Sequence, residues 1–122
     1  MKNPTLSILA FGIYALLMGI GLLFMPNTVL PIFGIATTTE VWIRVVGIIS
    51  LELALFYFRA ARKNDLHYMR ISVPGRIGFF IAMTALALLN LGPMVLILFG
   101  VIDLVFALWT AYALRENGQF EL

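Results

Sequence analysis

Four charged side chains interrupt segments that otherwise consist of leucine, isoleucine, valine and phenylalanine. They are Arg44, Glu52, Arg76 and Asp103. An aspartate, lysine or arginine at the centre of a membrane helix costs roughly 2.5–3.5 kcal/mol, and more when no opposite charge or hydrogen bond answers it. Charges in such places therefore hold helices together, or they bind a proton or a ligand.

The depth of these groups indicates which of them can meet. At 1.5 Å per residue, Glu52 lies about 15–18 Å inside its apolar segment, near the middle of a hydrocarbon layer of about 30 Å. Asp103 falls close to the midplane, and Tyr14 reaches a similar depth on the first apolar segment. We expect Glu52 to pair with Arg76. We expect Asp103 to be met by Arg44, by Tyr14, or by both.

Each apolar segment carries one stripe of polar or small residues at helical spacing. At 100° per residue, Asn90 shares a face with Arg76. The candidate residues for binding a ligand or a proton are Glu52, Asp103, Arg76, Arg44, Tyr14 and Asn90. Four stripes that face one another would form a polar core. A purely structural role, in which these charges fix the register of the helices, stays open.

The sequence lacks the residues and motifs of most metal sites and enzyme active sites. The chain has no cysteine and a single histidine, His67, so one copy cannot assemble a thiolate or histidine-rich metal site. It also lacks a Walker loop, GxGxxG, a nucleophile elbow and HExxH. We expect no catalytic residue, metal or cofactor, and we favour a protein that is not an enzyme. An intramembrane enzyme acting on an isoprenoid or lipid is a third, weaker hypothesis.

The elements that would position these residues follow from composition and hydropathy. Of the 122 residues, 62% are hydrophobic and 11% are charged, against roughly 25% charged in soluble domains. A short chain cannot bury this much apolar surface in one core, so lipid must cover the rest. The sequence predicts an all-α integral membrane protein, with a single four-span domain over residues 1–122. The spans are about 5–25, 41–60, 72–91 and 93–114.

The connectors between the spans differ in character. Residues 26–39 are uncharged and contain two prolines, which favours a short half-helix or lid in the headgroup region. The second connector, "RAARKNDLHYMR" (59–70), is basic. In the third, "NLGP" (90–93), we expect Gly92 to end one helix and Pro93 to start the next. So short a link predicts antiparallel neighbours, and hence an antiparallel four-helix bundle.

Charge asymmetry predicts the orientation of the bundle. Basic residues occur at Lys2, in the second connector and at Arg115, all on one side of the predicted membrane. The other two connectors have no Lys or Arg. Because basic residues near span ends mark the cytoplasmic side, both termini should be cytoplasmic (N-in/C-in). The expected location is a cell inner membrane, crossed several times.

Three stretches carry a family resemblance: "MPNTVLPIFGI" (25–35), "VWIRVVGIISLELALFYFRAAR" (41–62) and "GRIGFF" (75–80). With its Arg-Val-x-Gly element at residues 44–47, the chain resembles small bacterial four-helix membrane proteins grouped as DoxX-like. The resemblance implies a four-helix fold and a bacterial inner membrane, and it transfers no catalytic residue. Small multidrug resistance transporters have similar length and span number. Their first helix carries an acidic residue where this chain has Tyr14, and this departure argues against membership of that family.

Together these observations predict a polar-cored bundle that binds a small or lipophilic ligand, with proton-coupled transport as one form of the activity. The alternative is a non-catalytic accessory or assembly protein whose buried charges are structural. The expected partners are the lipid bilayer, a lipophilic small molecule, and a second copy or another membrane protein. The net charge of +2 rests on few groups, so we expect no nucleic-acid partner.

Overall fold

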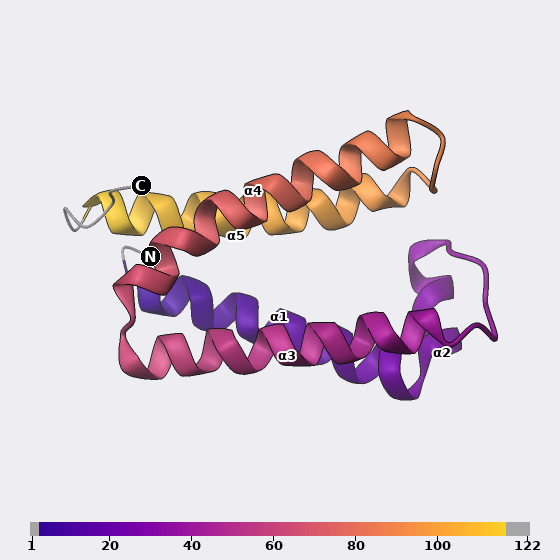
Figure 1. Cartoon of the computed structure of the whole chain (residues 1–122), viewed down its shortest axis with the longest axis horizontal. Helices are drawn as coiled ribbons and strands as arrows, with labels where there is room; N and C mark the ends of the chain where they lie inside the picture. The colour runs from indigo at the N-terminus through magenta and orange to yellow at the C-terminus, as the bar shows by residue number, and fades with distance from the viewer. Residues whose placement is uncertain (1–2, 117–122) are drawn as a thin grey trace. The chain divides into compact units, whose positions relative to one another are not determined.

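The computed structural model describes residues 3–116, and within this range the chain forms helices and no strand. The elements are α1 (Pro4–Phe24), α2 (Pro26–Val29), the 3-10 helix η1 (Leu30–Phe33), α3 (Trp42–Lys63), α4 (Leu66–Leu88) and α5 (Val95–Glu116) (Figure 1). The predicted all-α class is confirmed. A short helical piece between the first two predicted spans, at α2 and η1, is confirmed as well.

Three of the described helices, α1, α4 and α5, are long and apolar enough to cross a membrane. These three correspond to the first, third and fourth predicted spans. The second predicted span, residues 41–60, forms the 22-residue helix α3. Its length suits a span, but it carries Arg44, Glu52 and Arg59 along its body and two more basic residues in its last turn. A crossing by α3 therefore stays a prediction.

The predicted connector over residues 59–70 is wrong in its extent. Helix α3 continues to Lys63 and α4 already begins at Leu66, so only Asn64 and Asp65 separate them. The stretch contains no proline or glycine, and its arginine, alanine and leucine residues favour helix. The Asp65 side chain caps α4 by accepting a hydrogen bond from the Tyr68 backbone N–H at 3.1 Å.

Three helices end on a residue with left-handed backbone geometry. These residues are Gly34 (φ 73°), Asn64 (φ 52°) and Asn90 (φ 60°). At the end of α4, Asn90 N–H donates to the Ala87 carbonyl at 3.2 Å, and Leu91 N–H donates to the Leu86 carbonyl at 2.9 Å. This pair of bonds is the Schellman arrangement. The expectation that Gly92 ends the helix is therefore wrong, because asparagine also tolerates the left-handed region and takes that position first.

Substitutions at Asn90 should separate this backbone role from a role for its side chain. Asn90→Gly should leave the free energy of unfolding unchanged or slightly raised, because glycine adopts a positive φ without steric cost. Asn90→Ala should lower it by about 1 kcal/mol, because a Cβ penalises the left-handed region. Denaturant titration in detergent followed by circular dichroism measures both values. An equal loss in the two variants would show that the amide group itself is needed.

The described chain divides into two units, which we treat separately. Unit 1 contains residues up to Ile8 together with the chain from Ala60 onward, and unit 2 is Leu9–Arg59. The start of α1 thus belongs to unit 1 and its remainder to unit 2. In unit 1, α4 and α5 lie side by side and are joined by the short turn at Asn90 (Figure 1).

In unit 2, α1 and α3 approach each other closely enough to exclude side chains. A Cβ added at Gly47 would lie 2.6 Å from the Leu23 backbone nitrogen and 2.9 Å from the Gly19 carbonyl oxygen. One turn further along α3, the Ser50 hydroxyl donates to the Ala15 carbonyl at 2.7 Å. Late residues of α1 thus meet early residues of α3, so the two helices of this unit run in opposite directions.

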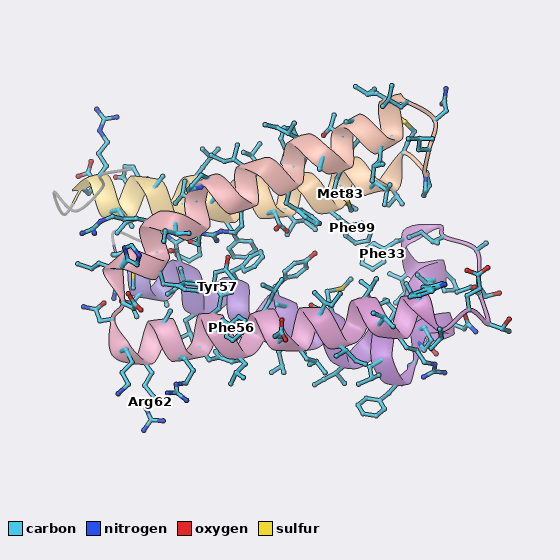
Figure 2. The ribbon with its side chains drawn as sticks, in the orientation of Figure 1. Phe33, Phe56, Tyr57, Arg62, Met83 and Phe99 are labelled. Carbon is cyan, nitrogen blue, oxygen red and sulfur yellow. The ribbon has the colours of Figure 1, made fainter. Side chains whose placement is uncertain are left out.

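Aromatic packing continues this contact toward the other end of α3. Tyr57 is buried, and its ring centroid lies 4.8 Å from that of Phe11 on α1. Its neighbour Phe56 is exposed, and both side chains are labelled in Figure 2. Arg62, in the last turn of α3, is exposed as well (Figure 2). The buried face of α3 is therefore aromatic and small, while large apolar side chains occupy much of its exposed surface.

Candidate functional site

Unit 1 contains a group of buried polar side chains in otherwise apolar helices. We call it the polar cluster, and it consists of Ser7, Ser72, Arg76, Asp103 and Thr110. Each of the five is at most 9% exposed. Ser7 lies on α1, Ser72 and Arg76 on α4, and the other two on α5. A fully buried arginine is rare in proteins, so the cluster stands out from the surrounding hydrocarbon side chains.

Helical spacing brings these residues onto facing sides of α4 and α5. Ser72 and Arg76 are four residues apart, and Asp103 and Thr110 are seven apart, so each pair lies on one face of its helix. Gly100 and Ala107 share the face of α5 and are also buried. A Cβ added at Gly100 would lie 3.1 Å from the Cα of Phe80, so this glycine permits a close approach to α4.

Arg76 is anchored by oxygen atoms from two helices. Its Nε donates to the Ser72 carbonyl at 3.2 Å, and its Nη2 donates to the Ser72 hydroxyl at 2.9 Å. The same Nη2 donates to Thr110 Oγ1 at 3.0 Å. Hydrogen bonds from a charged donor are worth about 1.5–3 kcal/mol each, so this arrangement offsets part of the cost of burying the guanidinium.

The hydroxyl groups form a continuous set of hydrogen bonds from Arg76 to the start of α1. Thr110 Oγ1 and Ser7 Oγ lie 2.6 Å apart, and either hydroxyl can be the donor of this bond. Each also has a backbone acceptor, the Phe106 carbonyl at 3.1 Å for Thr110 and the Pro4 carbonyl at 2.7 Å for Ser7. Three helices of the unit are tied together by these bonds.

Asp103 behaves differently from the hydroxyl groups. The residue is 9% exposed, and its carboxyl interacts electrostatically with the Arg76 guanidinium. Among the residues that the structure describes, none donates a hydrogen bond to this carboxyl. A carboxyl among apolar side chains that receives no hydrogen bond from the described residues calls for an explanation. The cluster thus combines an anchored cation with a carboxyl whose oxygens are available as acceptors.

The structure brings together two of the six predicted site residues, Arg76 and Asp103. Glu52 is exposed on α3 in unit 2. Arg44 donates a hydrogen bond from Nη1 to the Leu23 carbonyl, at the end of α1. The predicted pair of Glu52 with Arg76, and the predicted approach of Arg44 to Asp103, stay predictions.

The remaining two predicted residues lie elsewhere. Tyr14 is half-buried on α1, with its ring centroid 5.7 Å from that of Phe11. Asn90 occupies the exposed turn after α4, where its backbone conformation accounts for its presence. A role for either side chain in binding stays a prediction.

Sequence reasoning left three members of the cluster out of the candidate set, namely Ser7, Ser72 and Thr110. A signal for two of them is present in the spacing, because Ser72 precedes Arg76 by one turn and Thr110 follows Asp103 by two. Ser7 shares a helix face with Tyr14, seven residues further on, which is a signal of the same kind. Its contribution depends on the distance between α1 and α5, which no local pattern reports.

In the described part of the chain, no three His, Cys, Asp or Glu side chains come together in a way that could hold a metal ion. The chemistry that the cluster itself offers is therefore hydrogen bonding and charge pairing at Asp103 and Arg76. Comparisons of the chain with protein-family models, with curated proteins and with solved structures give no match.

Proposed function

We propose that the polar cluster binds a small or lipophilic ligand within the membrane, with proton-coupled transport as one form of this activity. The observation that carries the proposal is the buried Asp103 carboxyl beside Arg76, which receives no hydrogen bond from the described residues. Arg76 has acceptors on both helices, so the cation contributes to packing. Asp103 contributes no such bond, and binding explains its burial better than packing does.

The membrane setting of this proposal is an antiparallel four-helix bundle in a bacterial inner membrane. The spans would be α1, α3, α4 and α5, with both termini cytoplasmic. Three apolar helices and the one-sided distribution of basic residues support this arrangement. The resemblance to DoxX-like proteins points to the same fold and location. In this arrangement Glu52 would be a second acid within the membrane, carried by α3.

An accessory or assembly role is the second candidate, and a specific observation favours it. The chain of hydrogen bonds through Arg76, Thr110 and Ser7 ties three helices together, as expected for buried charges that fix register. Under this alternative, the partner would be a second copy or another membrane protein. The exposed Glu52 would then meet a polar group of that partner.

Native mass spectrometry of the detergent-purified protein distinguishes the two candidates. We expect the wild-type protein to retain a small molecule from the membrane, and we expect Asp103→Asn to lose it while the thermal unfolding midpoint changes little. Asparagine keeps the size of the side chain and removes the charge. Glu40→Gln, which neutralises an exposed acid outside the long helices, is the matched control and should retain the molecule.

Two results would overturn the proposal. Retention of the molecule by Asp103→Asn would show that the carboxyl takes no part in binding. Loss of folding in Asp103→Asn, together with no bound molecule in the wild-type protein, would favour the structural role. Glu52→Gln is a useful third variant, because loss of the molecule there would extend the site to α3.

A further inference from the structure

The hydroxyl protons of the polar cluster are all committed to acceptors within the chain. Ser72 Oγ donates to the Met69 carbonyl and Ser7 Oγ to the Pro4 carbonyl, both at 2.7 Å. Thr110 Oγ1 has the Ser7 hydroxyl at 2.6 Å and the Phe106 carbonyl at 3.1 Å. A hydroxyl has one proton to donate, so none is left over for Asp103.

Within the cluster, the Asp103 carboxyl is an acceptor group when it is ionised. Asp103 has two carboxyl oxygens with about four lone-pair positions, and no described residue donates to them. The residue as a whole is 9% exposed, so little of it is open to water. A ligand that completes this site must bring a hydrogen-bond donor.

The charge balance restricts the ligand further. When Asp103 is ionised, it attracts Arg76 electrostatically and the pair carries no net charge. A cationic ligand would leave the buried cluster with a net positive charge, and an anionic one with a net negative charge. Either state is costly where the dielectric constant is low. An uncharged donor leaves the balance unchanged.

The surroundings favour a ligand that dissolves in hydrocarbon. No Lys, Arg, Asp or Glu lies between Arg76 and Asp103 in the sequence. The second half of α4, the turn and the first part of α5 therefore carry no charged side chain. Many large apolar side chains along this stretch are exposed, including Ile81, Leu88 and Leu98. A molecule that reaches the cluster along this stretch must itself be lipophilic.

We infer that the ligand of the polar cluster is an uncharged lipophile that donates a hydrogen bond through a hydroxyl group to Asp103. This inference rests on the proposed binding function and adds the chemical class of the ligand. A site built to pair with a hydroxyl discriminates strongly against an analogue that lacks it, because its own polar group is then left buried without a partner.

Four probes with the same twelve-carbon tail test the assignment: dodecanol, methoxydodecane, dodecyltrimethylammonium and dodecanoate. Each is added at one fixed concentration to the wild-type protein in dodecylphosphocholine, a detergent without hydroxyl groups, and the thermal unfolding midpoint is recorded. We expect dodecanol to raise the midpoint by a few degrees more than the other three, because a ligand that binds only the folded state stabilises it by mass action. Methoxydodecane isolates the donor, since it keeps the oxygen and the tail.

The same series on Asp103→Asn and Glu40→Gln assigns the effect to its residue. The advantage of dodecanol should disappear in Asp103→Asn and persist in Glu40→Gln. An equal response to dodecanol and methoxydodecane, or a larger response to either charged probe, would overturn the inference. The order of the four probes on the wild-type protein needs no variant. It therefore tests the ligand class even if Asp103→Asn does not fold. A retained native molecule that depends on Asp103, combined with the wrong probe ranking, would refute the ligand class and leave the binding function standing.

Discussion

Gly47→Ala is expected to lower the free energy of unfolding by about 2–3 kcal/mol, at the upper end of the cost of overpacking a core. The added methyl group would meet the Leu23 backbone nitrogen at 2.6 Å and the Gly19 carbonyl oxygen at 2.9 Å. Backbone atoms cannot rotate away as a side chain can, so α1 and α3 must separate. Separation also weakens the hydrogen bond from Ser50 to the Ala15 carbonyl. Denaturant titration in detergent, followed by circular dichroism, measures the loss.

Gly78→Ala is the matched control for this prediction. A Cβ at Gly78 meets nothing within 4 Å, so the same chemical change adds helix propensity without a clash. We expect it to raise the free energy of unfolding by about 0.5–1 kcal/mol. Similar losses at Gly47 and Gly78 would contradict the close packing of α1 on α3.

Arg76→Leu is expected to have the largest effect of any single substitution, a loss of about 3–5 kcal/mol in the free energy of unfolding. The change leaves the Asp103 carboxyl buried without its cation and removes the donor shared by Ser72 and Thr110. It also keeps an apolar side chain in place, so the loss does not arise from an empty cavity. The measurement is again denaturant titration in detergent.

The double variant Arg76→Leu with Asp103→Leu tests whether the loss comes from the charges. Removing both members of a buried pair is often neutral or stabilising, whereas removing one leaves an uncompensated charge. We therefore expect the double variant to recover most of the stability lost in Arg76→Leu alone. Simple addition of the two single losses would show that Arg76 and Asp103 are not energetically coupled. Arg62→Leu, at an exposed position, serves as the control for loss of an arginine.

The sequence predicted helices well where proline and hydropathy agree. The predicted first span, 5–25, matches α1 (Pro4–Phe24) within one residue at each end, because Pro4 and Pro26 flank it. The start of α4 was missed by six residues. Hydropathy reports which residues suit lipid, whereas helix formation continues through polar residues such as His67 and Arg70 when no breaker intervenes.

The charged residues of the candidate site could be predicted from the sequence, but its hydroxyl groups could not be assigned to it. Arg76 and Asp103 stand out because they interrupt apolar runs, and both are buried. Serine and threonine are common in membrane helices, so their presence alone does not indicate a binding site. Which hydroxyls serve Arg76 depends on distances across helices, and so does the meeting of Arg44 with the Leu23 carbonyl. A periodic pattern carries no information about those distances.

The turn at Asn90 bears on how the α4–α5 pair enters a membrane during synthesis. Its backbone closes on itself through the Leu86 and Ala87 carbonyls, so the tip needs few hydrogen bonds from outside. It also carries no ionisable side chain between Arg76 and Asp103. A loop of this kind has a low barrier to translocation, and the two helices can insert together as a preformed hairpin. The cluster would then be completed when this hairpin packs against the start of α1, which carries Ser7 and is synthesised first.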